Sequence, residues 1–210
     1  LGEMIKIGRR GSLTGKLTII GHQGHVAYPS RANNPSTTIV NILKELKEIQ
    51  FDKGTRDFQP TNLEVTRINI NNTADNVIPA TAEATFNIRF NNKHSSNSLK
   101  KKLNKIFKKI TKKNKSKFKI EYRVSGEAFL TKPNKTTFMI QNIIKKITKL
   151  KPKLSTTGGT SDLRFIRTIC PGLEFGLVGK TMHKVDEAVS LKDLKKLTKI
   201  YENILKNYFK

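Results

Sequence analysis

The chain has 210 residues, a hydrophobic fraction of 36%, a formal net charge of +25 at pH 7 and a single cysteine, Cys170. This length accommodates one domain or two small ones with a real apolar core. The composition excludes an internal disulfide, and it shows neither an apolar run of the ~18 residues that a membrane span needs nor the apolar core of a signal peptide. We therefore expect a cytoplasmic protein that binds no membrane.

The first part of the chain alternates between strand and helix patterns. Apolar residues recur at every second position in the strands and at helical spacing in the helices. The resulting β-α-β-β-α-β order is the ferredoxin-like pattern, whose antiparallel sheet carries both helices on one face and leaves an edge free for partners. In chain order, these elements are a strand at 13–20, a helix at 35–50, strands at 62–71 and 80–90, a helix at 98–113 and a strand at 118–124.

The pattern changes from Ser125 onward to that of the remainder of an α/β domain. We expect residues 1–12 to form the other flank of that domain, so that the ferredoxin-like unit of residues 13–124 is inserted into it. Ser190 is a good N-cap for the last helix. The expected elements are helices at 136–150, 162–168 and from 190 to the C-terminus, and a short strand at 173–177.

Two histidines occupy loops in which an imidazole could do chemistry. His25 lies on a glycine-flanked turn after the first strand, where it could face an anion or oxyanion or simply stabilise the turn. His183 precedes the acidic pair Asp186–Glu187, and a loop imidazole near carboxylates can bind zinc. The chain has no HExxH, CxxC or HxH pattern, and it does not visibly supply the three protein ligands that a catalytic zinc needs.

Arginines and a glycine-rich segment are the candidates for binding carboxylates. The guanidinium groups of Arg9–Arg10 and of Arg89 could bind a carboxylate in a bidentate manner, or they could be ordinary surface and edge-strand charges. Backbone N–H groups of Thr160 and Ser161, after Gly158–Gly159, could bind a carboxylate at a helix start. Plain N-capping by these hydroxyls is the alternative.

The high positive charge admits two interpretations. It could mark a surface for nucleic acid or another anionic partner. Lysine supplies most of the charge, however, and it is accompanied by many Asn and Ile residues, which AT-rich codons favour together. The basic runs also lack interleaved aromatic residues. We therefore expect solvated helix faces and no nucleic-acid partner.

Several short motifs combine arginine, glycine, histidine and hydroxyl residues. They are Gly8–Ser12 (GRRGS), Gly24–Pro29 (GHVAYP), Asn76–Pro79 (NVIP), Asn87–Phe90 (NIRF), Gly158–Asp162 (GGTSD) and His183–Glu187 (HKVDE). In content and order they resemble a family of co-catalytic zinc aminoacylases and peptidases, and within it the succinyl-diaminopimelate desuccinylases. The resemblance covers essentially the whole chain.

The resemblance implies an α/β fold, in which a ferredoxin-like βαββαβ dimerisation domain is inserted into a zinc-binding catalytic domain. It implies a homodimer that acts on a small anionic substrate, with two zinc ions per active site and cobalt as a possible replacement. The implied reaction is hydrolysis of N-succinyl-LL-2,6-diaminopimelate to succinate and LL-diaminopimelate in lysine biosynthesis. The alternatives are a related aminoacylase or carboxypeptidase, or a dimerisation or binding module without catalytic activity.

The resemblance also implies roles for single residues. His183 matches a metal ligand, and His25 matches a histidine that reaches the partner subunit's active site and hydrogen-bonds the tetrahedral intermediate. The other metal ligands and the general-base glutamate of the family lie upstream of Gly8. We therefore expect a C-terminal portion of the enzyme that is inactive alone. The substrate-binding positions are Arg9, Asn76, Arg89, Ser125, Gly159 and Thr160.

Overall fold

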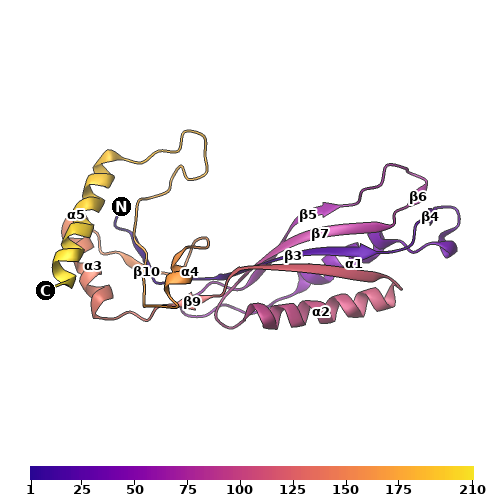
Figure 1. Cartoon of the computed structure of the whole chain (residues 1–210), viewed down its shortest axis with the longest axis horizontal. Helices are drawn as coiled ribbons and strands as arrows, with labels where there is room; N and C mark the ends of the chain where they lie inside the picture. Colours follow the sequence, from indigo (N-terminus) through magenta and orange to yellow (C-terminus); the bar gives the residue numbers. More distant parts are fainter. The chain divides into compact units, whose positions relative to one another are not determined.

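A computed structural model describes residues 1–210 and divides them into two compact units (Figure 1). The first unit is Arg10–Phe129. The second unit combines Leu1–Arg9 with Leu130–Lys210. None of the helices has both the length and the apolar character that crossing a bilayer requires.

A four-stranded antiparallel sheet, in the order β5-β7-β3-β8, forms the first unit together with two helices. The two helices contact each other as well as the sheet, and one apolar core lies between them and the sheet. This arrangement confirms the ferredoxin-like fold that the strand and helix patterns predict. The elements are β3 (Gly11–Ile20), α1 (Pro35–Glu48), β5 (Asn62–Asn69), β7 (Thr81–Phe90), α2 (Ser96–Lys113) and β8 (Lys117–Gly126).

Two glycines of β3 make room for two phenylalanines of β7 in this core. Gly11 pairs with Phe90 and Gly15 pairs with Phe86, and both rings are fully buried. A Cβ atom at Gly15 would lie 2.3 Å from the Phe86 ring, and one at Gly11 would lie 2.2 Å from the Phe90 ring. The match of glycine to phenylalanine therefore fixes the register of β3 on β7, since a shift by one residue would reverse the faces.

Side-chain caps determine where the two helices begin. The Asn34 side chain accepts a hydrogen bond from the Ser36 N–H at 2.9 Å, with Pro35 as the first helical residue. Ser95 and Ser98 form a reciprocal capping box at α2. Helix α2 therefore begins at residue 96, two residues before the predicted start at residue 98.

The second unit is built around a small apolar cluster that includes Ile5, Ile144 and Ile200. Strand β1 pairs in parallel with β10, and helices α3 and α5 contact each other. Ser190 caps α5 as predicted, because its hydroxyl accepts a hydrogen bond from the Asp193 N–H. The elements are β1 (Met4–Lys6), β2 (Gly8–Arg9), α3 (Lys135–Thr148), β10 (Lys153–Ser155), α4 (Leu163–Ile166) and α5 (Leu191–Tyr208). Strand β9 (Phe129–Leu130) lies at the boundary, since Phe129 is the last residue of the first unit.

One prediction for this unit is wrong, and one of two alternatives is excluded. The segment 173–177 is not a strand, because only Glu174 forms an isolated bridge, with Lys6. Its apolar residues pack directly on the cluster, so their alternation reflects packing and not a hydrogen-bonded ladder. The hydroxyls of residues 160 and 161 do not cap α4, since Asp162 is the N-cap residue and makes no side-chain cap bond.

Candidate functional site

A short two-stranded ribbon at one end of the first unit carries His25. Strand β4 (Gly24–His25) pairs antiparallel with β6 (Val77–Ile78). The Val26 N–H donates to the Asn76 carbonyl oxygen at 3.0 Å. The structure thus brings together two residues, His25 and Asn76, that the sequence analysis assigned to the site.

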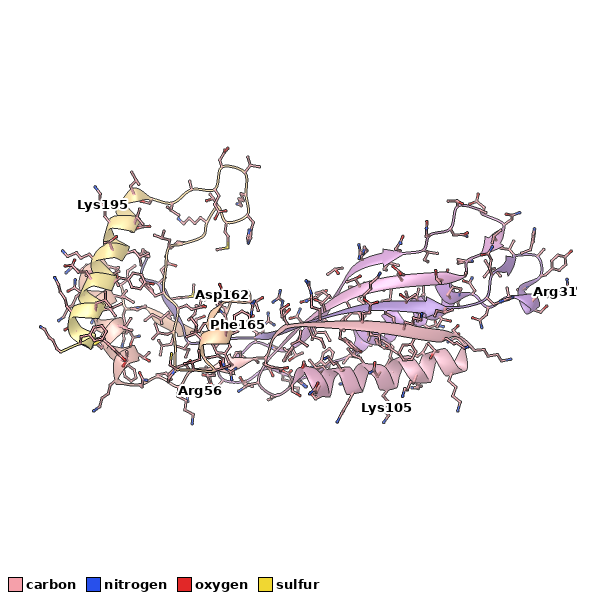
Figure 2. The ribbon with its side chains drawn as sticks, viewed as in Figure 1. Arg31, Arg56, Lys105, Asp162, Phe165 and Lys195 are labelled. Atoms are coloured by element: carbon pink, nitrogen blue, oxygen red, sulfur yellow. The ribbon has the colours of Figure 1, made fainter.

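The hydrogen bonds of the His25 ring define which nitrogen is its donor. The Ala27 N–H donates to His25 Nδ1 at 3.1 Å, so the proton of the neutral ring resides on Nε2. The ring lies 6.0 Å from that of Tyr28, over which the Arg31 guanidinium lies at 5.3 Å. His25 is exposed, and Figure 2 shows Arg31 at this same end of the unit. His25 therefore presents an Nε2–H donor in an exposed, positively charged neighbourhood.

The opposite end of the sheet holds the second group of predicted site residues. Arg89 pairs with Ser12 on one side and with Asn62 on the other, and Ser12 also pairs with Gly126. The register shifts at this point, which leaves Ser125 as the extra residue of a β-bulge. Bulges often re-aim side chains next to functional sites. Arg89 and Ser125 thus lie at the same end of the sheet, on the two strands that flank β3.

Arg10 adds a second positive charge at this end. One of its terminal nitrogens donates to the Pro60 carbonyl oxygen at 3.0 Å and to Asn62 Oδ1 at 2.8 Å. Partial burial, followed by the charge of Arg89, lowers the pKa of Arg10. The two guanidinium groups therefore repel each other here. This repulsion favours the binding of an anion between them.

His25 and Arg89 lie near opposite ends of strand β3, although neither residue belongs to it. Arg89 is opposite the start of β3, and the His25 ribbon follows the end of β3 (Figure 1). The 10 residues of β3 span about 30 Å. One small molecule therefore cannot contact both side chains of the same chain.

In the second unit, Arg9 lies against the glycine-rich segment. Its Nε donates to Glu174 Oε2 at 2.9 Å, and a terminal nitrogen donates to the Thr157 carbonyl oxygen at 2.6 Å. Gly158 has φ +110°, and a Cβ atom there would lie 2.0 Å from that nitrogen, whereas Gly159 faces open space. The sequence does not indicate Glu174 as the partner of Arg9, because the alternation of its segment predicts a strand.

The residues after these glycines contain two buried side-chain atoms without a hydrogen-bond partner, Ser161 Oγ and Arg164 Nε. The Ser161 hydroxyl oxygen is buried and has no hydrogen-bond partner within residues 1–210. Buried hydroxyls in native proteins almost always have a partner. The Ser161 hydroxyl, next to the predicted substrate contact Thr160, therefore has spare hydrogen-bonding capacity. The adjacent Asp162 is labelled in Figure 2.

His183 lies apart from the other candidates of this unit, in an exposed turn. Its backbone is left-handed, with φ 62°, and its N–H donates to Glu187 Oε2 at 3.3 Å. Residues 1–210 contain no group of three or more His, Cys, Asp or Glu side chains placed to hold a metal ion. The residues of this chain therefore do not form the predicted two-zinc centre by themselves.

A family model described as the peptidase dimerisation domain matches residues 7–115. The chain is 81% identical over 209 residues to the succinyl-diaminopimelate desuccinylase of Pelagibacter ubique, covering 100% of this chain and 54% of that protein. It is 49% identical to the enzyme of the same name from Methylobacterium radiotolerans, covering 100% and 53%. The chain thus spans about half the length of the curated relatives it matches.

Solved structures share the fold at low sequence identity. A tripeptidase from Staphylococcus aureus aligns with a TM-score of 0.83 and 19% identity, over 98% of this chain and 53% of that one. An M20 family metallo-carboxypeptidase from Sulfolobus solfataricus aligns with a TM-score of 0.72 and 15% identity, over 97% and 59%. Both alignments include both units of the chain.

Proposed function

The chain belongs to the peptidase dimerisation domain family, and from this premise we propose that it is the C-terminal portion of a succinyl-diaminopimelate desuccinylase. The whole protein then hydrolyses N-succinyl-LL-2,6-diaminopimelate to succinate and LL-diaminopimelate, a cytoplasmic step of lysine biosynthesis. The 81% identity along the entire chain to a relative of that name carries this proposal.

We further propose that the whole protein is a homodimer. The length of β3, about 30 Å, supports it, because His25 and Arg89 lie near its opposite ends and two residues that serve one small substrate must then come from different chains. Strand β5 is an edge strand with exposed apolar side chains at Val65 and Ile68. Such an edge is a ready surface for pairing with a second copy.

In the dimer, His25 serves the active site of the partner subunit. Its Nε2–H donates to the substrate's carbonyl oxygen as negative charge develops there, and the Ala27 N–H holds the ring in the required tautomer. Arg9, with its orientation fixed by Glu174, and Arg89 bind substrate carboxylates. The proposed contacts to the amide and the remaining carboxylate oxygens come from Asn76, Ser125, Gly159 and Thr160.

The proposed cofactor of the whole protein is zinc, two ions per active site, with cobalt as a substitute. His183 is the one ligand that we assign to this chain. Because no three-residue metal group exists within residues 1–210, the other ligands belong to the part of the protein outside this chain.

A substrate panel tests the proposed activity. Full-length protein loaded with zinc is assayed with N-succinyl-diaminopimelate, its N-acetyl analogue and a dipeptide. The proposal predicts that kcat/KM is highest for the succinyl substrate. A preference for the acetyl compound or the dipeptide would indicate the related aminoacylase or peptidase activity instead. Absence of any hydrolysis, together with salt-dependent retention on DNA, would favour a binding module.

A further inference from the structure

The connector between α1 and β5 is fixed by a buried carboxylate. Asp52 Oδ1 accepts hydrogen bonds from the Gly54 N–H at 2.6 Å and from Asn91 Nδ2 at 2.7 Å. Its Oδ2 accepts from the Thr61 N–H at 3.3 Å and lies 3.1 Å from His94 Nε2. The Asp52 side chain is 6% exposed. Although burial opposes ionisation, the hydrogen bonds from Thr61, Gly54 and Asn91 hold the pKa of Asp52 at about 2.

This fixed connector determines the position of Arg10. The Asp52 bond to the Thr61 N–H lies between the two acceptors of Arg10, the Pro60 carbonyl and the Asn62 side chain. Arg10 is half-buried and therefore has little freedom to reorient. Its guanidinium group is pre-organised, which lowers the entropy cost of binding a ligand.

Arg10 and Arg89 lie on the same face of the sheet. Asn62 and Arg89 are directly opposite each other on β5 and β7, so their side chains share a face with Cβ atoms about 5 Å apart. The Asn62 side chain in turn holds Arg10. Both acceptors of Arg10 are neutral, so neither compensates its charge. A carboxylate between the two guanidinium groups would relieve their mutual repulsion.

We propose that Arg10 is a further substrate-binding residue, which together with Arg89 forms a site for one carboxylate of the substrate. This inference rests on the proposed function for the identity of the ligand. The position of the Arg10–Arg89 site rests only on the geometry of β5, β7 and the connector between α1 and β5. The competing role for Arg10 is a purely structural tie to Pro60 and Asn62.

Steady-state kinetics of the full-length protein separate these two roles. We expect Arg10→Gln to raise KM about 10- to 100-fold with little change in kcat, because a carboxylate contact exists in both the ground state and the transition state. Arg123→Gln is the matched control. Arg123 is an exposed arginine of β8 on the same face, opposite Thr14, and we expect its variant to change KM less than twofold.

Substrate analogues that each lack one carboxylate identify the contact. For one of these analogues, the KM values of wild type and Arg10→Gln should agree within about twofold, since the partner of Arg10 is already missing. If Arg10→Gln weakens every analogue by the same factor, Arg10 has only a structural role and the proposal fails.

A binding measurement keeps the inference distinct from the proposed activity. Calorimetric titration of the full-length protein with succinate, used as a dicarboxylate probe, needs no turnover. We expect binding to wild type and to Arg123→Gln, and at least about tenfold weaker binding to Arg10→Gln. Equal affinity in wild type and Arg10→Gln, or no binding to wild type at millimolar succinate, would overturn the carboxylate site even if the enzyme is active. Loss of activity with intact succinate binding would instead count against the proposed reaction.

Discussion

Removing the Asp52 carboxylate should loosen the connector between α1 and β5. In Asp52→Ala, three buried or partly buried donors lose a charged acceptor, namely the N–H groups of Gly54 and Thr61 and the Asn91 amide. Each donor left unsatisfied costs about 1–3 kcal/mol, and partial access of water to the loop reduces the sum. We expect the local free energy of opening of this segment to fall by about 3–5 kcal/mol.

Hydrogen–deuterium exchange of the full-length protein measures this loss in the segment itself. Peptides that cover residues 50–62 should exchange about 100-fold faster or more in Asp52→Ala, because 1.4 kcal/mol corresponds to a factor of 10. Glu45→Ala, on the exposed face of α1, is the control and should leave the exchange of these peptides almost unchanged. Unchanged protection of residues 50–62 in Asp52→Ala would refute the role assigned to the carboxylate.

The pH dependence gives an independent arm of the same test. Folding lowers the pKa of Asp52 from 3.8 to about 2, so the stabilisation is fully present above pH 4 and is lost as the pH falls from about 4 to 2. This lowering of the Asp52 pKa corresponds to about 2 kcal/mol. Protection of residues 50–62 in wild type should decline over this interval, whereas Asp52→Ala should show no such decline.

Two further predictions concern the core and the metal. Gly15→Ala should lower the free energy of unfolding of the first unit by about 2 kcal/mol or more, because the added Cβ lies 2.3 Å from the Phe86 ring. In chemical denaturation, Phe86→Leu in the same protein should restore part of this loss. A Gly15→Ala protein as stable as wild type would contradict the packing. The chain of residues 1–210 alone should bind zinc only weakly, since His183 is the one ligand assigned to it, and tight stoichiometric binding in calorimetry would show that the metal site is assigned wrongly.

The sheet could be predicted from the sequence because local patterns dictate it. Alternation in residues 80–90 places Phe86 and Phe90 on one face, and the glycines of β3 occupy the matching positions. Helix α2 begins earlier than its apolar stripe, since the Ser95–Ser98 capping box and not the stripe sets its start. Local chemistry thus determines both the order and the limits of these elements.

The site could be predicted only in part, because its decisive contacts join residues far apart in the chain. Arg9 was identified by its motif, but its partner Glu174 lies 165 positions away in a segment whose alternation indicated a strand. The Asp52 connector likewise depends on Asn91 and His94, and no periodic pattern connects them. Arg10 was grouped with Arg9 in the sequence, whereas the structure places it with Arg89.

Mixed dimers of the full-length protein test most directly whether His25 acts across the subunit interface. One subunit carries His25→Ala and the other carries His183→Ala, so that a trans arrangement leaves one of the two active sites intact. Each homodimeric variant should lose roughly 100-fold or more in turnover, as expected for the loss of an oxyanion donor or of a metal ligand. The mixed dimer should keep about half of the wild-type activity per dimer. A mixed dimer as inactive as the His25→Ala homodimer would show that His25 does not serve the partner subunit.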